Sequence, residues 1–96
     1  MCTISYEPRL HRLRLAGACV EGDVEAIRQA IAHHGRDQEV LIVDVTGVQT
    51  ITDDAARSIL ETAKGIGSSR FCVLRKHDTH VDRLFSRLEH ELTDQE

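Results

Sequence analysis

The chain has 96 residues, of which 41% are hydrophobic and one is proline, and this composition suits one compact domain over residues 1–96. Its formal net charge of −4 disfavours general nucleic-acid binding, which depends on clustered Lys and Arg side chains that release counterions from phosphates. No apolar run approaches the roughly 20 residues that span a bilayer, so no direct membrane contact is expected. Cys2, Cys19 and Cys72 show no CxxC spacing, which favours a reducing, cytoplasmic location.

Two short strands are predicted before the first helix. Ile4 and Tyr6 alternate with polar residues, Pro8 breaks this pattern, and residues 12–16 alternate arginine and leucine. Alternation with a period of two is typical of strands that have one face in water. Because the two strands are so close in sequence, we expect them to be antiparallel neighbours.

The remainder of the chain alternates helices and strands. Apolar residues with helical spacing predict three helices, over about residues 23–35, 52–65 and 78–92. The run VLIVDV at 40–45 predicts a central strand covered on both faces, and FCVL at 71–74 predicts another buried strand. The predicted order is β-β-α-β-α-β-α, an α/β fold with a mostly parallel four-stranded sheet.

The best candidate site lies between the central strand and the second helix. Ligand and partner sites of open α/β sheets gather at the carboxyl ends of the strands, and residues 46–54 are predicted to form a turn at such an end. Thr52 or Asp53 is expected to cap the helix, because a side-chain oxygen there accepts a hydrogen bond from a free first-turn N–H. Capping and the helix dipole explain Asp53 well but Asp54 only in part. Arg57, one turn later, is expected to pair with Asp53 or with a partner.

The stretch VLIVDVTGVQTITDDAARSILETAKGI, residues 40–66, resembles the central segment of STAS domains, a family of anti-sigma-factor antagonists and cytoplasmic domains of sulphate transporters. Its DVTGV motif is especially similar to the stressosome-scaffold branch of that family. The preceding RLRLAGACVEGDVEAIRQAI is similar to the strand and helix before this segment, so the resemblance covers roughly residues 12 to 75. It implies a STAS-like fold and a cytoplasmic, non-enzymatic domain that regulates transcription, for example in a stress response.

The resemblance also implies a phosphorylation switch, whose motif is degenerate in this sequence. In bacterial members an Asp followed by Ser or Thr opens the second helix, and a cognate anti-sigma kinase phosphorylates the hydroxyl. Aligned from DVTGV, that Asp falls on Thr52 and the phosphoacceptor position on Asp53, so the hydroxyl is missing. Either Asp53 and Asp54 imitate a phosphate, which carries about −1.5 to −2 charges, or the switch is lost and the turn is simply acidic. Whether Thr50, Thr52 or Ser58 accepts phosphate instead stays open.

The partners that the resemblance implies are a kinase-like anti-sigma factor or stressosome-type proteins. They would bind the turn and the N-terminal half of the second helix, through Thr52, Asp53, Asp54 and Arg57. The alternative is an accessory STAS subunit that docks on a transport ATPase or another complex, without a phosphorylation switch. Family members usually continue to a further strand and helix, so we also expect an open sheet edge and self-association into a homo-oligomer.

No catalytic, metal or cofactor site is predicted. The segment HDTHVD at 77–82 fits no zinc spacing, and it is interpreted as a polar helix start that is capped by Asp78 or Thr79. Cys72 lies in an apolar strand, where a free cysteine is usually a small core residue rather than a nucleophile. A receiver-like phosphoaspartate at Asp44 would need an acidic pair after the first strand, and RLAGACVEGD offers only two separated acidic residues.

Overall fold

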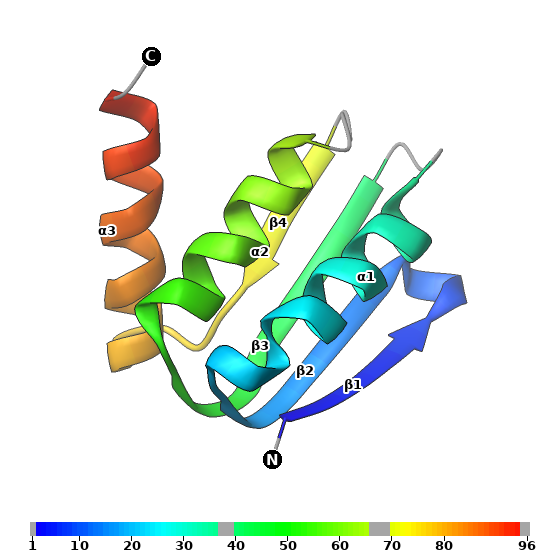
Figure 1. Ribbon diagram of the computed structural model, residues 1–96, viewed down its shortest axis with the longest axis horizontal. Helices are drawn as coiled ribbons and strands as arrows, with labels where there is room; N and C mark the ends of the chain where they lie inside the picture. Colours follow the sequence, from blue (N-terminus) through cyan, green and yellow to red (C-terminus); the bar gives the residue numbers. More distant parts are fainter. Residues whose placement is uncertain (1, 37–39, 66–69, 95–96) are drawn as a thin grey trace.

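The computed structural model describes residues 2–36, 40–65 and 70–94, which form four strands and three α-helices (Figure 1). The strands are β1 (Cys2–Glu7), β2 (Arg12–Cys19), β3 (Val40–Ile51) and β4 (Arg70–Leu74). The helices are α1 (Val24–Gly35), α2 (Asp53–Gly65) and α3 (His80–Asp94), and short 3₁₀ turns precede β2 and α1. The α/β class predicted from the sequence is confirmed.

The four strands lie in the order β1-β2-β3-β4. β1 runs antiparallel to β2, with Ile4 opposite Leu15, as predicted, whereas β2, β3 and β4 are parallel neighbours. The sheet is therefore mixed. Its one antiparallel pair follows from the short connection at Pro8–Leu10, because parallel neighbours need a longer crossover such as α1 or α2.

α1 and α2 cover one face of the sheet, and α3 packs alongside α2 beyond β4 (Figure 1). Alternate strand residues point to this face and meet the apolar stripes of the helices. The fully buried core side chains include Leu13, Leu15, Leu41 and Val43 from the strands and Ile27, Ile31, Ile59, Phe85 and Leu88 from the helices. Each such side chain contributes roughly 1.5–3 kcal/mol when it is removed from water, so aliphatic burial holds these layers together.

The opposite face of the sheet differs from the prediction. Ile42 is only half-buried there, Cys72 is exposed, and Leu74 is 41% exposed. The predictions of a central strand covered on both faces, of a buried β4 and of a core cysteine at Cys72 are therefore wrong. The strand order explains this arrangement. The crossovers from β2 to β3 and from β3 to β4 have the same hand and advance across the sheet in the same direction, so their helices, α1 and α2, lie on the same face.

β3 is longer than predicted, because it continues to Ile51. Residues 46–51 were expected in a turn, but they form strand that pairs with the second half of β2, where Cys19 is opposite Ile51. Register shifts between Arg14 and Ala16 and between Gly17 and Ala18 accommodate this extension. Thr52 alone connects β3 to α2, so the junction that carries the candidate site is short and fixed.

Candidate functional site

The candidate site is the start of α2, where Thr52 joins strand to helix. The Thr52 hydroxyl accepts a hydrogen bond from the amide of Ala55 at 3.2 Å, so Thr52 is the cap and Asp53 is the first helical residue. The Thr52 amide donates to the carbonyl of Cys19 at 3.0 Å. The helix start is thus fixed both by its own cap and by the end of β2.

Replacing Thr52 with alanine is expected to lower the free energy of unfolding by about 1 kcal/mol, because the cap hydrogen bond is lost. Thr52→Ser keeps the oxygen and should stay within a few tenths of a kcal/mol of wild type. Urea unfolding followed by circular dichroism measures both variants. Equal losses for alanine and serine would show that the methyl group, rather than the cap, matters at this position.

Asp53 points to α3 rather than along its own helix. Arg87 Nη2 donates to Asp53 Oδ2 at 2.7 Å, and Arg57 Nη2 lies 3.5 Å from Glu91 Oε2. Arg87 Nε lies 3.9 Å from Glu91 Oε1 and so connects the two pairs. Asp53, Arg87, Glu91 and Arg57 form a charge ladder of alternating sign between α2 and α3. The expected pairing of Arg57 with Asp53 is replaced by these contacts, because α3 brings an opposite charge to each of them.

The charge ladder lies at the surface. The side chain of Asp53 is 63% exposed and that of Arg87 is 55% exposed. Exposed ion pairs of this kind contribute only about 0–1 kcal/mol, because water screens them. A partner protein could therefore take the place of Asp53 or Arg87 in this ion pair with little loss of folding stability.

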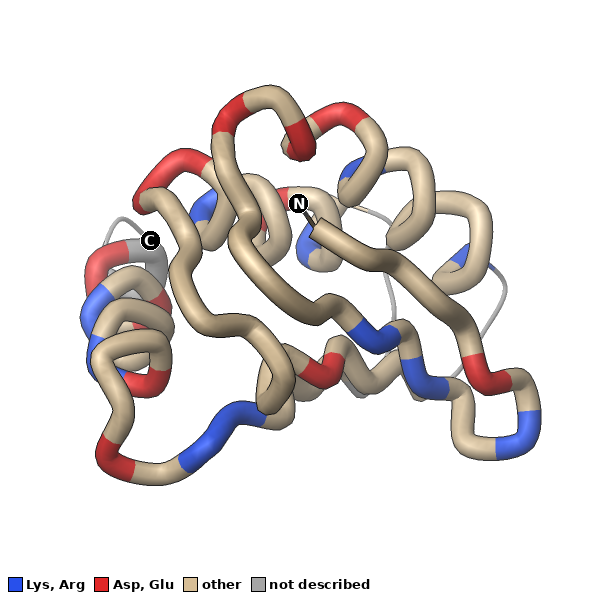
Figure 2. The backbone as a smooth tube through the Cα atoms, turned by 90° about the horizontal axis from the view of Figure 1, so that it is seen from below, with Lys and Arg blue, Asp and Glu red and all other residues tan. Residues whose placement is uncertain are grey.

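Asp54 supplies a second negative charge at the same helix end. It is exposed, and its carboxylate makes no hydrogen bond or ion pair with the part of the chain that the structure describes. Acidic residues also lie in the first turns of α1 and α3, and Figure 2 shows red segments on several sides of the molecule. Negative charge at a helix start is favoured by the helix dipole, so this placement is stable without any partner.

Thr50, Thr52 and Ser58, whose hydroxyls were left open as phosphate acceptors, lie in different surroundings. Ser58 is buried on the inner side of α2, where only 9% of it is exposed. The Thr52 hydroxyl is engaged as the cap of α2. Thr50 is exposed near the end of β3. A kinase could therefore reach Thr50 without opening the fold, whereas Ser58 would have to leave the core.

Asp44, which was considered as a receiver-like phosphoacceptor, lies on the uncovered face of the sheet, yet it is only 2% exposed. It accepts hydrogen bonds from the Thr46 hydroxyl at 2.6 Å and from the Thr46 amide at 2.9 Å. Arg14 Nε and Arg12 Nη1 lie 3.5 and 3.7 Å from its Oδ2. The carboxylate is thus held on several sides by the protein.

These contacts also determine how Asp44 titrates. Burial by itself would raise the pKa of the carboxyl group, but the hydrogen bonds from Thr46 and the charges of Arg14 and Arg12 outweigh it and hold the pKa below its usual value. Sequence reasoning missed this cluster. The outward-facing arginines of residues 12–16 were the available signal, because the β2–β3 register places Arg14 directly opposite Asp44.

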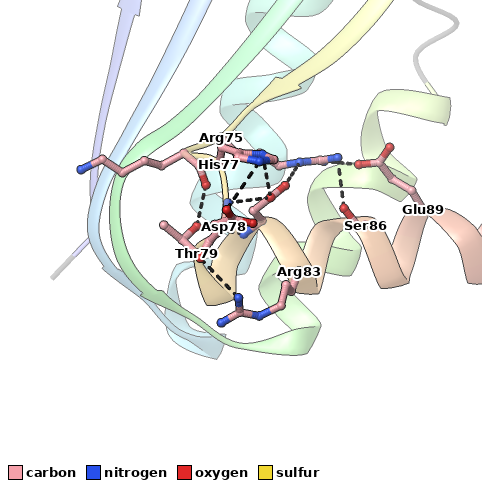
Figure 3. Close-up of polar contacts among 9 residues, drawn as sticks. Arg75, His77, Asp78, Thr79, Arg83, Ser86 and Glu89 are labelled. Carbon is pink, nitrogen blue, oxygen red and sulfur yellow. Dashed lines mark hydrogen bonds and ion pairs between the residues drawn. The ribbon is translucent and has the colours of Figure 1, made fainter.

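The segment HDTHVD, residues 77–82, forms the turn before α3 and the first residues of that helix (Figure 3). The Thr79 hydroxyl accepts a hydrogen bond from the Asp82 amide at 3.1 Å, so Thr79 is the cap, one of the two that were predicted. Arg75 donates to Asp82 at 2.8 Å and also to Glu89 and Ser86, which fixes the end of β4 against α3. These residues thus hold the helix in place.

Among the described residues, no group of three or more His, Cys, Asp or Glu residues could hold a metal ion, and no buried side-chain nitrogen or oxygen lacks a hydrogen-bond partner. A hollow of about 370 Å³ lies between the end of β3 and the start of α3, where Thr46, Lys76 and His80 line part of it. None of the helices in the described ranges is long and apolar enough to cross a membrane.

Comparison with known proteins adds no assignment. No family model matches the chain, and no curated protein matches it. What can be said of function therefore depends on the fold, on the charge ladder and on the resemblance of residues 40–66.

Proposed function

We propose that this chain is a STAS-type regulatory domain that acts without catalysis, by binding a second protein through the start of α2. The observation that carries the proposal is the exposure of Asp53 and Asp54 on the first turn of that helix, directly after the central strand. The parallel pairing of β2, β3 and β4, with α1 and α2 on one face, supports it as a framework that presents this helix start.

The proposed partner is a kinase-like anti-sigma factor or a protein of a stressosome-type assembly. It would meet two carboxylates at the helix start and the two arginines of the charge ladder, Arg57 and Arg87, beside them. A complementary surface has basic groups for Asp53 and Asp54 and an acidic group for the arginines. Electrostatic matching of this kind governs specificity and association rate more than it governs affinity.

The ion pair between Asp53 and Arg87 favours one of the two hypotheses for the acidic turn. Because Arg87 partly neutralises the Asp53 carboxylate, Asp53 presents less negative charge to a partner than a phosphate would. This contact supports the hypothesis that the phosphorylation switch is lost. Asp54, which has no such contact in the described part of the chain, is then the more available charge for a partner.

The experiment is an affinity pull-down from the native cell lysate, with bound proteins identified by mass spectrometry. Tagged wild type is compared with Asp53→Lys and with a matched control, Glu61→Lys, which reverses an exposed charge in the other half of α2. We expect a kinase-like anti-sigma factor or stressosome protein with wild type and Glu61→Lys, and its loss with Asp53→Lys. Circular dichroism verifies that both variants are folded.

Two outcomes would contradict the proposal. A transport ATPase as the captured partner would favour the accessory-subunit alternative. Equal capture of the same partner by all three proteins would contradict a binding surface that includes Asp53.

A further inference from the structure

Two cysteines that are distant in the sequence meet at one corner of the sheet. Cys2 opens β1 and Cys19 ends β2, and their Sγ atoms are 2.8 Å apart. A disulfide bond needs about 2.05 Å between its sulfurs, so the two Sγ atoms lie less than about 1 Å from bonding distance. Cys19 is buried and Cys2 is half-buried, which leaves one of the two thiols within reach of a small oxidant.

A disulfide bond between Cys2 and Cys19 would restrain the start of β1. Among the described strands, β1 is an edge strand that pairs only with β2, so its first residues are held by few contacts. A link from Cys2 to Cys19 would fasten this end of β1. The Cys19 carbonyl accepts the hydrogen bond from the amide of Thr52, so the link would also lie one hydrogen bond from the cap of α2.

We propose that Cys2 and Cys19 form a reversible disulfide when the protein meets a peroxide. The Cys2 sulfur takes one oxygen of the peroxide and becomes a sulfenic acid, and the other oxygen leaves as water. The Cys19 sulfur then attacks the sulfenic sulfur, the S–O bond breaks, and the hydroxyl leaves with the Cys19 proton as a second water. Two thiols thereby lose two electrons and two protons to one peroxide, and this inference does not rest on the proposed function.

The surroundings of the two sulfurs assign their order of reaction. Burial and then the contact with Cys2 raise the pKa of Cys19 to about 12, so Cys19 stays a protonated thiol at neutral pH. Cys2 is the more accessible of the pair, so Cys2 reacts first. Cys19 then resolves the sulfenic acid and gives its proton to the departing hydroxyl as the S–S bond forms. Cys72 is exposed on β4, and serine at that position removes competing reactions.

The test uses the Cys72→Ser protein, treated with hydrogen peroxide and then with an alkylating reagent after unfolding. Trypsin cleaves after Arg9, Arg14 and Arg28, so a disulfide joins the peptides 1–9 and 15–28. We expect this linked pair in the non-reduced digest and its loss after dithiothreitol. The melting temperature should rise by about 10 °C on oxidation, because the link constrains the unfolded chain, and should return on reduction.

Two control variants make the result specific. Cys2→Ser should leave Cys19 fully alkylated after peroxide treatment. Cys19→Ser should give no linked peptide. Alkylation of both thiols in peroxide-treated Cys72→Ser would overturn the inference. Accumulation of Cys2 as a sulfinic acid beside a free Cys19 would overturn it as well, because the second step would then not occur.

Discussion

Replacing Phe85 with alanine is expected to lower the free energy of unfolding by about 3–5 kcal/mol. Phe85 is fully buried and is one of only two phenylalanines in the chain. With Val81 and Leu88 it attaches α3 to the core, whereas the ion pairs between α2 and α3 are exposed and contribute little. A loss of this size is a large fraction of the roughly 5–15 kcal/mol by which native domains are stable.

Urea unfolding followed by circular dichroism measures this loss, and Leu84→Ala is the matched control. Leu84 is the preceding residue of the same helix and is only half-buried, so its truncation should cost clearly less. If the two variants lost equal stability, the attachment of α3 would not depend on the buried ring. Because α3 carries Arg87 and Glu91, Phe85→Ala should also disorder the charge ladder.

Replacing Asp44 with alanine is expected to cost about 2–3 kcal/mol. Removing one partner of a fully buried ion pair costs about 3–5 kcal/mol, because the remaining charge is left uncompensated. The cost is smaller here, since the Arg14 side chain is 47% exposed and water screens it, while Glu7 remains 2.9 Å from Arg12. Asp44→Asn removes the charge but keeps the side-chain shape, so its comparison with Asp44→Ala separates the effect of the lost charge from that of the lost packing.

Asp44 also makes the stability depend on pH. Its pKa is depressed in the folded protein, so its contribution is fully present above the unfolded value, about 3.9, and is lost as the pH falls through the folded value. Unfolding curves between about pH 6 and pH 2 should show a smaller acid-dependent loss for Asp44→Asn than for wild type. Parallel pH profiles for the two proteins would contradict the role assigned to this carboxylate.

Features that depend on neighbours in sequence were predictable. The inner stripes of the helices followed from apolar spacing, as Ile27 and Ile31 in α1 and Ile59 in α2 show. The two caps, Thr52 and Thr79, were among the alternatives because a cap needs only a side-chain oxygen within three residues of a free N–H. The antiparallel pairing of β1 and β2 followed in the same way from their short connection.

Features that depend on strand order and on distant residues were not predictable. VLIVDV has the same pattern whether Ile42 meets a helix or water, so the uncovered face of the sheet could not be read from it. The charge ladder joins Asp53 to Arg87 across 34 positions, and the Cys2–Cys19 contact spans 17. The charge ladder depends on the packing of α3, and the cysteine contact depends on the register of β1. Neither feature is visible in a short stretch of sequence.

The affinity of the partner recovered with wild type tests most directly whether the start of α2 is the binding surface. Isothermal titration would compare wild type with Asp53→Lys, Asp54→Lys and the control Glu61→Lys. We expect the two reversals at the helix start to weaken binding by about 10- to 100-fold, or roughly 1.4–2.8 kcal/mol, and Glu61→Lys to stay within about twofold of wild type. Equal affinity for all four proteins would contradict the proposed binding surface and move the search to another face.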